Sequence, residues 1–422
     1  MLLERRDLGT PAALVAEIRA LAPQAPSVAD AVTEIIEAVV TEGDAAVRRY
    51  TARFDADPPP PARVAAEELA HALAVLDPAV RAGLEVAIAN VAEVAWAAAD
   101  EDRLVTLVQG QQVLLREIPV ARAAVYVPGG RAPYPSTVVM GAVTARSAGV
   151  ADVVVATPPP IDPVTLAACE LIGVSEVHRI GGAQAIAALA HGTETVVAVD
   201  VIVGPGNLYV QEAKRQLSGR VGIDGFAGPS DLVVLFDAPD AGSIRLVAHD
   251  LLAQAEHGEA SLVVAVAPEA ALLDALETDL RRLWAGQTAP FVLVHAGSLE
   301  HALDFANCFA PEHLELIGAG AEALAPRVRA AGCVFIGWPS ATAFGDYVAG
   351  SNHILPTDGS ARFAAALGPR NFRRQMTELR VDHGSLQALA RAGVPIARAE
   401  GFVAHAESMR ARVPDFVENP SP

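Results

Sequence analysis

Histidine, carboxylate and amide side chains gather at four places in an otherwise apolar sequence. Taken one at a time, each could be a solvated or hydrogen-bonded surface group. Taken together they suit a metal ion, because a borderline cation such as zinc accepts histidine nitrogen and carboxylate oxygen, and a catalytic site leaves one position open for substrate. Such a site would consist of His257, Asp346 and His405, with a neutral oxygen from Gln254.

The adjacent pair Glu312 and His313 offers two groups that move protons. Oxidation of an alcohol needs a base that takes the hydroxyl proton as hydride leaves, and histidine is the usual base near neutral pH. Oxidation of the resulting aldehyde to an acid needs an activated water, which a neighbouring carboxylate can provide. The pair therefore places both groups side by side.

Three glycine-rich loops follow β-like runs and open helices, at residues 126–131, 180–184 and 204–207. Glycine allows close approach of the backbone, and a helix N-terminus favours an anion such as a dinucleotide pyrophosphate. None has the G-x-G-x-x-G fingerprint of the usual Rossmann loop. Each carries a polar or aromatic neighbour (Tyr126, Gln184 or Asn207), so a cofactor crevice and ordinary tight turns both remain open.

Two stretches of alternating strand-like and helical patterns must position these residues. The expected strands are 123–127, 153–156, 177–180 and 196–203, then 232–236, 261–266, 291–295 and 333–337. This alternation predicts parallel sheets with helices on both faces. Because ligands of open α/β sheets bind at the carboxyl ends of the strands, we expect the polar and glycine-rich motifs to lie there.

Other segments flank these stretches. Residues 11–21, 28–53 and 66–99 have helical patterns, the last interrupted at Asp77-Pro78, and 104–108 with 113–118 reads as a β-hairpin. The tail beyond about 368 is arginine-rich and reads as helical. The fold class we expect is therefore two open, Rossmann-like doubly wound α/β domains of incomplete topology, with small N- and C-terminal helical extensions.

Composition narrows the function classes. The 422 residues are 52% hydrophobic and carry a formal net charge of −19, which disfavours nucleic-acid binding. Lys214 is the single lysine, so a G-K-[ST] phosphate loop is excluded. The sequence has three cysteines and no C-x-x-C pair, which favours a reducing compartment such as the cytoplasm. The N-terminus is charged and no apolar run is long enough for a membrane helix, so we expect no membrane partner.

The motifs resemble those of histidinol dehydrogenases in identity, order and spacing. They are YVPGGRAPYPST (126–137), IGGAQAIAALA (180–190), GPGN (204–207), AGPS (227–230), DLLAQAEHG (250–258), APEHLEL (310–316), GDYVAGSNHILPT (345–357) and EGFxAH (400–405). The helical stretch from about 28 fits as well. Together these motifs are far more specific than any one of them.

The resemblance implies a role for each matching residue. Gln254, His257, Asp346 and His405 would bind one zinc per subunit and contact the substrate, with His405 donated by the partner subunit of a homodimer. His313 would be the general base and a substrate contact, and Glu312 would activate water. The remaining substrate residues would be Ser230, His353 and Glu400, and the NAD contacts would be Tyr126, Gln184 and Asn207. The family oxidises L-histidinol through L-histidinal to L-histidine and reduces two NAD; its zinc positions the substrate.

The resemblance also suggests a division of the chain. We expect an N-terminal extension (1–22), a first α/β domain (23–124 and 230–367) with most zinc and catalytic residues, a second (125–229) with the NAD loops, and a dimerisation tail (368–422). The sequence departs from the family pattern at Gly141 and Thr144, where Asn and Pro are usual, at Asp231, where Glu is usual, and over 339–344 and 367–377.

Two other functions compete with histidinol oxidation. A relative could use the same zinc and NAD apparatus on another small alcohol or diol, but His353 and Glu400, which suit an imidazole and an amine, are both present. A non-catalytic nucleotide-binding scaffold would not need the pair Glu312 and His313. Stoichiometric zinc in the purified protein would separate an enzyme from such a scaffold.

Overall fold

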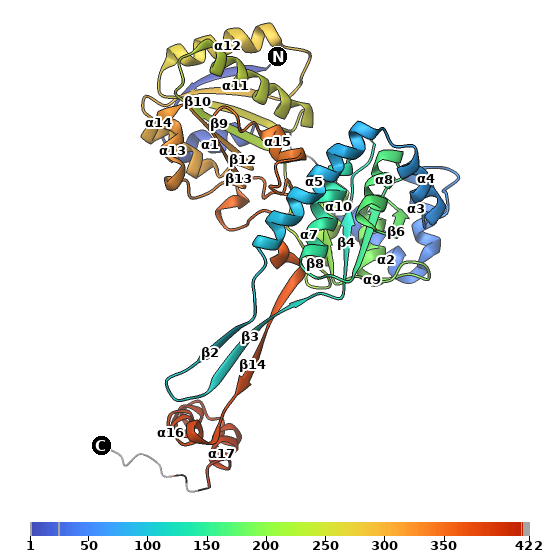
Figure 1. The fold of residues 1–422 in the computed structure, drawn as a ribbon, viewed down its shortest axis with the longest axis vertical. Helices are drawn as coiled ribbons and strands as arrows, with labels where there is room; N and C mark the ends of the chain where they lie inside the picture. The colour runs from blue at the N-terminus through green and yellow to red at the C-terminus, as the bar shows by residue number, and fades with distance from the viewer. Residues whose placement is uncertain (1, 24–25, 131, 415, 417–422) are drawn as a thin grey trace. The chain divides into compact units, whose positions relative to one another are not determined.

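The computed structural model describes residues 2–23, 26–130, 132–414 and 416. The chain forms two compact units: a core unit of Met1–Ala99 with Val120–Phe372, and a tail unit of Asp100–Pro119 with Arg373–Pro422. Among the described residues, no helix combines the length and the apolar character needed to cross a bilayer. Both units can be followed along the ribbon in Figure 1.

One parallel sheet of the core unit has five strands in the order β6-β5-β4-β7-β8. Its alanine- and valine-rich strands are buried on both faces, as a sheet covered by helices on both sides requires. The strands are β4 (Arg122–Tyr126), β5 (Asp152–Thr157), β6 (Glu176–Arg179), β7 (Val201–Val203) and β8 (Gly222–Ile223). The helices between them are α6 (Pro135–Val138), a π-helical turn (Val139–Val143), α7 (Thr144–Ser147), α8 (Pro163–Ile172), α9 (Gly182–His191) and α10 (Leu208–Leu217). The expected alternation is confirmed, although β7 is shorter than 196–203.

Helices from the N-terminal third cover this five-stranded sheet. They are α2 (Ala29–Glu42), α3 (Asp44–Phe54), α4 (Ala66–Ala74) and α5 (Pro78–Ala97), and a break at Gly43 divides the helix expected over 28–53. Val32, Ile35 and Val39 of α2 pack in one cluster with Ala124 and Tyr126. The apolar faces of these helices are therefore buried against the sheet that carries the glycine-rich loops. The expected division of the chain into domains stays a prediction.

The second sheet of the core unit has six parallel strands in the order β1-β11-β10-β9-β12-β13. They are β1 (Leu3–Asp7), β9 (Asp231–Phe236), β10 (Leu262–Ala267), β11 (Phe291–His295), β12 (His313–Ile317) and β13 (Cys333–Ile336). The associated helices are α1 (Pro11–Arg19), α11 (Ala241–Gln254), α12 (Ala270–Leu283), α13 (Leu299–Phe309), α14 (Ala319–Glu322) and α15 (Thr342–Tyr347). Two strands were not predicted: β1, within the segment expected to be only helical, and the short β12.

The tail unit contains an antiparallel sheet in the order β14-β3-β2, with β2 (Arg103–Thr106), β3 (Gln112–Pro119) and β14 (Arg373–Arg380). The β2–β3 hairpin is confirmed. The expectation that the tail has no strand is wrong, because 373–380 pairs with the whole length of β3. Two helices follow, α16 (His383–Ala399) and α17 (Val403–Arg410), and they share a small core around Ala390, Val394 and Ala406.

Candidate active site

The polar motifs of the six-stranded sheet meet where its strands begin. Asp231 is the first residue of β9 and His313 is the first residue of β12, and these strands are neighbours in parallel register. The last residue of α11, Gln254, reaches the same edge and donates through Nε2 to Ser230 Oγ at 2.7 Å. The expectation that these motifs lie at the carboxyl ends of strands is therefore wrong. The cluster is formed by side chains at the amino ends of β9 and β12 and at the C-terminal end of α11.

Glu312 and Asp231 hold each other through reciprocal hydrogen bonds. The Glu312 N–H donates to Asp231 Oδ1 at 2.6 Å, and the Asp231 N–H donates to Glu312 Oε2 at 3.2 Å. Ser230 Oγ also donates to Glu312 Oε2, at 2.5 Å. Burial raises the pKa of Glu312 against the opposing effects of His313 and Ser230. The Glu312 carboxyl is thus fixed through one oxygen, and within the described residues its Oε1 accepts no hydrogen bond.

His313 is almost fully buried, and its two ring nitrogens face different partners. Nδ1 lies 3.3 Å from the Asp231 carbonyl oxygen, to which it can only donate. Nε2 is buried without a hydrogen-bond partner in the described structure, and Asp346 Oδ1 lies 3.5 Å from it. Burial by itself lowers the pKa of His313, but Glu312 and then Asp346 outweigh it and raise the value to about 9. Nε2 is therefore the nitrogen available to a reacting proton.

Asp346 connects His313 to the other histidines. Its carbonyl oxygen lies 2.8 Å from His353 Nδ1, and His353 Nε2 lies 3.3 Å from Thr137 Oγ1. Burial alone would raise the pKa of Asp346, but the nearby His313, His353 and His257 lower it below its usual range. Burial lowers the pKa of His353. The structure thus places Asp346 among three imidazoles.

The donor set includes buried atoms that lack a partner. Gln254 Oε1 is buried and accepts no hydrogen bond, while its amide nitrogen is engaged by Ser230. His257 follows in a 3₁₀ turn, Ala255–His257, so the α-helix itself ends at Gln254. In the parts of the chain that the structure describes, no group of three or more His, Cys, Asp or Glu side chains is arranged to hold a metal ion. One amide, one imidazole and one carboxylate suit a cation, but a further donor must complete the set.

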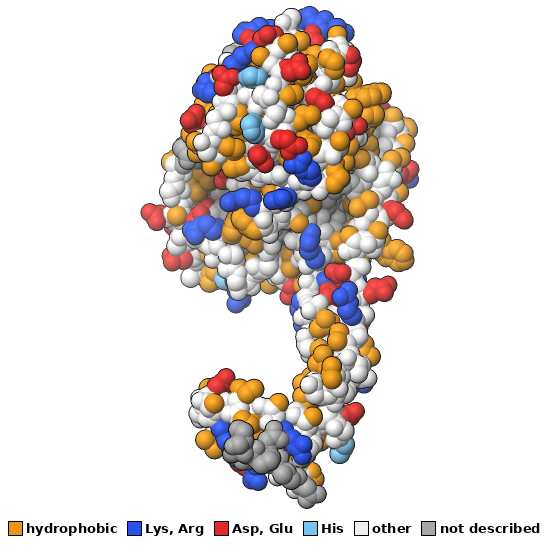
Figure 2. Space-filling view, turned by 90° about the vertical axis from the view of Figure 1, so that its left-hand side faces the viewer, with side chains coloured by type: hydrophobic (Ala, Val, Ile, Leu, Met, Phe, Trp, Pro, Cys, Tyr) orange, Lys and Arg blue, Asp and Glu red, His pale blue; other side chains and the backbone are white. Residues whose placement is uncertain are grey.

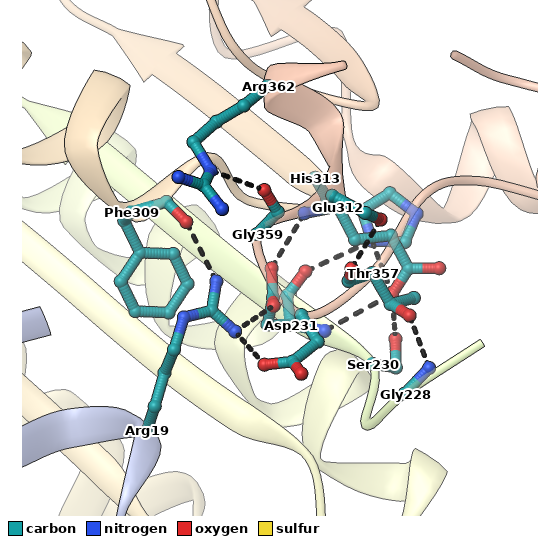
Figure 3. A network of polar contacts seen from close by, with 12 residues as sticks. Arg19, Gly228, Ser230, Asp231, Phe309, Glu312, His313, Thr357, Gly359 and Arg362 are labelled. Atoms are coloured by element: carbon teal, nitrogen blue, oxygen red, sulfur yellow. Dashed lines mark hydrogen bonds and ion pairs between the residues drawn. The ribbon is translucent and has the colours of Figure 1, made fainter. Parts of the chain in front are cut away.

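A network behind the site reaches the first helix (Figure 3). Arg19 of α1 donates to Asp358 Oδ1 and to the Phe309 carbonyl oxygen, each at 2.7 Å, and its Nη1 lies 3.7 Å from Asp231 Oδ2. Burial, followed by the charge of Glu312, raises the pKa of Asp231 to about 7. The Gly228 N–H donates to Thr357 Oγ1 and ties the Ser230 loop to this network. Sequence reasoning missed Arg19, because an arginine at the end of a helix resembles a solvated residue.

Several departures from the family pattern lie close to this site. A Cβ on Gly141 would come within 2.5 Å of Val125, and Thr144 Oγ1 donates to the Met140 carbonyl oxygen at 2.6 Å. Thr342, in the departing segment 339–344, donates through its N–H and hydroxyl to Glu315 Oε1 at 2.9 and 2.6 Å. Asp250 on α11 adjoins Glu315, and burial raises the pKa of both carboxyls. Thr342 and Asp250 thus contact Glu315, which lies two residues after His313 in β12.

The three glycine-rich loops lie at the carboxyl edge of the five-stranded sheet, as expected, and they line a cavity of about 560 Å³. Tyr126 Oη accepts from the Gly182 N–H at 3.1 Å, and Asn207 Oδ1 caps α10 through the N–H groups of Tyr209 and Val210. Gln184 also lines this cavity. A Cβ at Gly204, whose φ is +112°, would lie 2.1 Å from the Tyr126 carbonyl oxygen, so only glycine fits.

The single lysine lies behind these loops and is not available to a ligand. Lys214 is 1% exposed, and its Nζ donates to the Gly204 carbonyl oxygen at 2.6 Å and to Asp224 Oδ1 at 2.5 Å. Asp224 Oδ2 in turn accepts from the Gly204 N–H at 2.7 Å. The lysine therefore fixes the third loop. The cavity also includes Phe54 and Asp55, which the sequence did not indicate.

Glu400 and His405 belong to the tail unit and are exposed there. Glu400 directly follows α16, and His405 is on α17 with its ring 5.3 Å from that of Phe402. Leu379, Ile396, Phe402 and Val403 of this unit are each at least half exposed, and hydrophobic side chains are visible on its surface (Figure 2). The tail unit thus presents two polar candidates on a surface that also exposes large apolar side chains.

Comparison with known proteins identifies the family. A sequence profile of histidinol dehydrogenase matches residues 20–413. The chain is 43% identical over 393 residues to a histidinol dehydrogenase from Parasynechococcus marenigrum (strain WH8102), covering 90% of each chain, and 40% identical over 432 residues to one from Thermobifida fusca (strain YX), covering 98% of each. A solved histidinol dehydrogenase from Elizabethkingia anophelis superposes with a TM-score of 0.91 at 29% identity over 98% of both chains. The chain belongs to the histidinol dehydrogenase family.

Proposed function

We propose that this chain oxidises L-histidinol to L-histidine through L-histidinal, with reduction of two NAD, as the last steps of histidine biosynthesis. The observation that carries the proposal is the convergence of Ser230, Gln254, Glu312, His313, Asp346 and His353 at one edge of a sheet, in a member of this family. When bound, NAD accepts hydride and zinc orients the substrate imidazole and amine.

His313 is the proposed general base. Because Nδ1 donates to the Asp231 carbonyl oxygen, the ring is oriented with Nε2 free to take the proton of the substrate hydroxyl. Its raised pKa depends in part on the Asp346 carboxylate, and engagement of Asp346 by a cation would weaken that effect. A lower pKa would favour the neutral imidazole that a base requires.

Glu312 is proposed to activate water for the second oxidation. Ser230 and the Asp231 N–H hold Oε2 in place, so Oε1 can accept a proton from a water molecule. Burial raises the pKa of Glu312, which makes the ionised carboxylate a stronger base once it forms. The two residues therefore divide the two oxidations between them.

Gln254, His257 and Asp346 would hold the zinc together with His405 of the partner subunit. The unpartnered buried Oε1 of Gln254 and the low pKa of Asp346 fit such a cation. Ser230, His353 and Glu400 would complete the substrate site, and Tyr126, Gln184 and Asn207 would contact NAD. A homodimer would cover the apolar side chains that the tail unit exposes. The cytoplasmic location and the absence of nucleic-acid and membrane partners stay predictions.

The test is to add L-histidinol and excess NAD to the purified protein and to count NADH per substrate, with and without chelator. Two NADH per histidinol, lost on chelation and restored by zinc, is the expected result. No turnover of histidinol, with NAD reduced on another small alcohol, would overturn the proposed substrate while keeping the chemistry. No bound zinc and no NAD reduction on any alcohol would point to a scaffold.

A further inference from the structure

The cavity at the glycine-rich loops contains one charged side chain among its described lining residues, and that side chain is a carboxylate, Asp55. The other described residues that line the cavity are apolar, glycine or neutral polar. Arg53 lies nearby with its guanidinium over the Phe54 ring at 5.0 Å, but it does not line the cavity. A dinucleotide bound here would therefore meet one negative charge and no described arginine or lysine.

The position of Asp55 beside the proposed NAD contacts is defined on two sides. Its Oδ2 accepts from Gln184 Nε2 at 3.3 Å, and its Oδ1 lies against Gly181, where a Cβ would be 3.1 Å away. Burial by the cavity wall raises the pKa of Asp55 to about 6, and no ion pair to it occurs among the described residues. An ionised carboxylate accepts about four hydrogen bonds, so most of this capacity is free for a ligand that carries donors.

The surrounding backbone fixes where the phosphates of the ligand belong. Helices α9 and α10 both begin at the cavity, near Gly182 and Asn207, and their N-termini favour the pyrophosphate. Among the donors that remain on the dinucleotide, the ribose hydroxyls suit Asp55, since acidic residues in dinucleotide sites accept hydrogen bonds from a ribose diol. A phosphate on that diol would face a carboxylate instead of a cation.

We propose that Asp55 binds the ribose diol of the adenosine half of the dinucleotide and thereby selects NAD over NADP. The inference rests on the proposed function, because it assumes that a nicotinamide dinucleotide fills this cavity. Asp55 would act as a binding and specificity residue that takes no part in proton transfer. Its substitution should therefore change cofactor affinity and leave the chemistry at His313 unchanged.

The test is calorimetric titration of the intact protein with NAD, NADP and ADP, without histidinol. Replacement of a hydrogen-bonded charged acceptor typically weakens binding about tenfold to a hundredfold. We expect Asp55→Asn to weaken the binding of NAD and of ADP by the same factor, of about tenfold or more. The binding of NADP should become tighter. The matched control is Asp57→Asn in the same loop, because Asp57 is exposed and does not line the cavity. The control should bind all three ligands like the wild type.

The outcomes separate this inference from the function on which it rests. If the wild type binds NAD, and Asp55→Asn binds both NAD and NADP with the affinities of the wild type, the proposed role of Asp55 is wrong and the proposed function stands. If Asp55→Asn binds NAD more weakly but ADP with unchanged affinity, the assignment to the adenosine ribose is wrong. If the wild type binds neither dinucleotide, the proposed function fails and this inference fails with it. Thermal unfolding of each variant shows whether a weak binder is still folded.

Discussion

The two parallel sheets of the core unit use opposite edges for the two proposed sites. In the five-stranded sheet the loops follow the carboxyl ends of β4, β6 and β7, and they lead into helix N-termini. In the six-stranded sheet the proposed catalytic residues lie at the amino ends of β9 and β12, where α11 and α13 end at Gln254 and Phe309. One edge therefore offers backbone N–H groups, and the other offers carbonyl groups and side chains.

The difference has an electrostatic reason. A helix N-terminus carries partial positive charge and favours phosphate, whereas a helix C-terminus carries partial negative charge and favours cations. The carboxyl edge suits an anionic dinucleotide. The amino edge suits a metal ion, and Arg19 already donates to the Phe309 carbonyl oxygen at the end of α13. The usual rule that ligands bind at the carboxyl ends of the strands thus fits the proposed dinucleotide site. It does not fit the proposed metal site.

The largest effect should come from removal of the base at the amino edge. We expect His313→Ala to slow the alcohol-to-aldehyde step by roughly 10²–10⁴, the usual contribution of a general base. The affinity for NAD, which we propose to bind at the carboxyl edge of the five-stranded sheet, should not change. Single-turnover kinetics with calorimetry of NAD binding would measure both. A comparable loss of NAD affinity would contradict the separation of the two edges.

Glu312→Gln should affect the rates of the two oxidations differently. We expect the aldehyde-to-acid step to slow by roughly 10², because an amide cannot accept a proton from water, while the first step changes little. Supplying histidinol and histidinal separately and following NADH from each would measure this. Equal slowing of both steps would contradict the separate roles proposed for Glu312 and His313.

Mixed dimers would show whether the amino edge is completed by a second subunit. His405→Ala and Asp346→Ala should each be inactive alone. Co-expressed at equal levels, they should regain about a quarter of wild-type activity, because half of the dimers are mixed and each mixed dimer has one intact site of two. Two chains that both carry Asp346→Ala serve as the control. No recovery in isolated mixed dimers would count against a shared site.

The smallest effect concerns the pH dependence of stability. The pKa of Asp231 is raised from 3.8 to about 7, first by burial and then by Glu312, so the folded protein holds a proton that the unfolded chain releases. The wild type should therefore lose stability as pH rises from about 4 to about 7. In the same interval the Tm of Asp231→Asn should gain a few degrees relative to the wild type. Asp231→Glu is the control that keeps the carboxyl; a constant Tm difference for Asp231→Asn would contradict the assignment.

The sequence predicted the regular alternation, the motif residues and the edge of the glycine-rich loops, but not the edge at which the polar motifs of the six-stranded sheet meet. Periodicity identified β9, β10 and β11, yet it missed β12, because its polar residues His313 and Glu315 interrupt the apolar run. It missed β14 because an arginine-rich and mostly polar strand resembles a solvated helix. Arg19 and Asp55 were missed for a different reason: their partners, at Asp358 and Gln184, are more than a hundred residues away, and no local pattern encodes that proximity.

The single buried lysine has a practical consequence. Amine-reactive reagents reach Lys214 only if the contact between its Nζ and the Gly204 loop opens, because the side chain is 1% exposed and held by two oxygens. Covalent labelling at this position, followed by peptide mass, therefore reports local opening of the segment from β7 to α10 without any engineered probe. The rate of that labelling, with and without dinucleotide, would give the opening free energy of the loop directly.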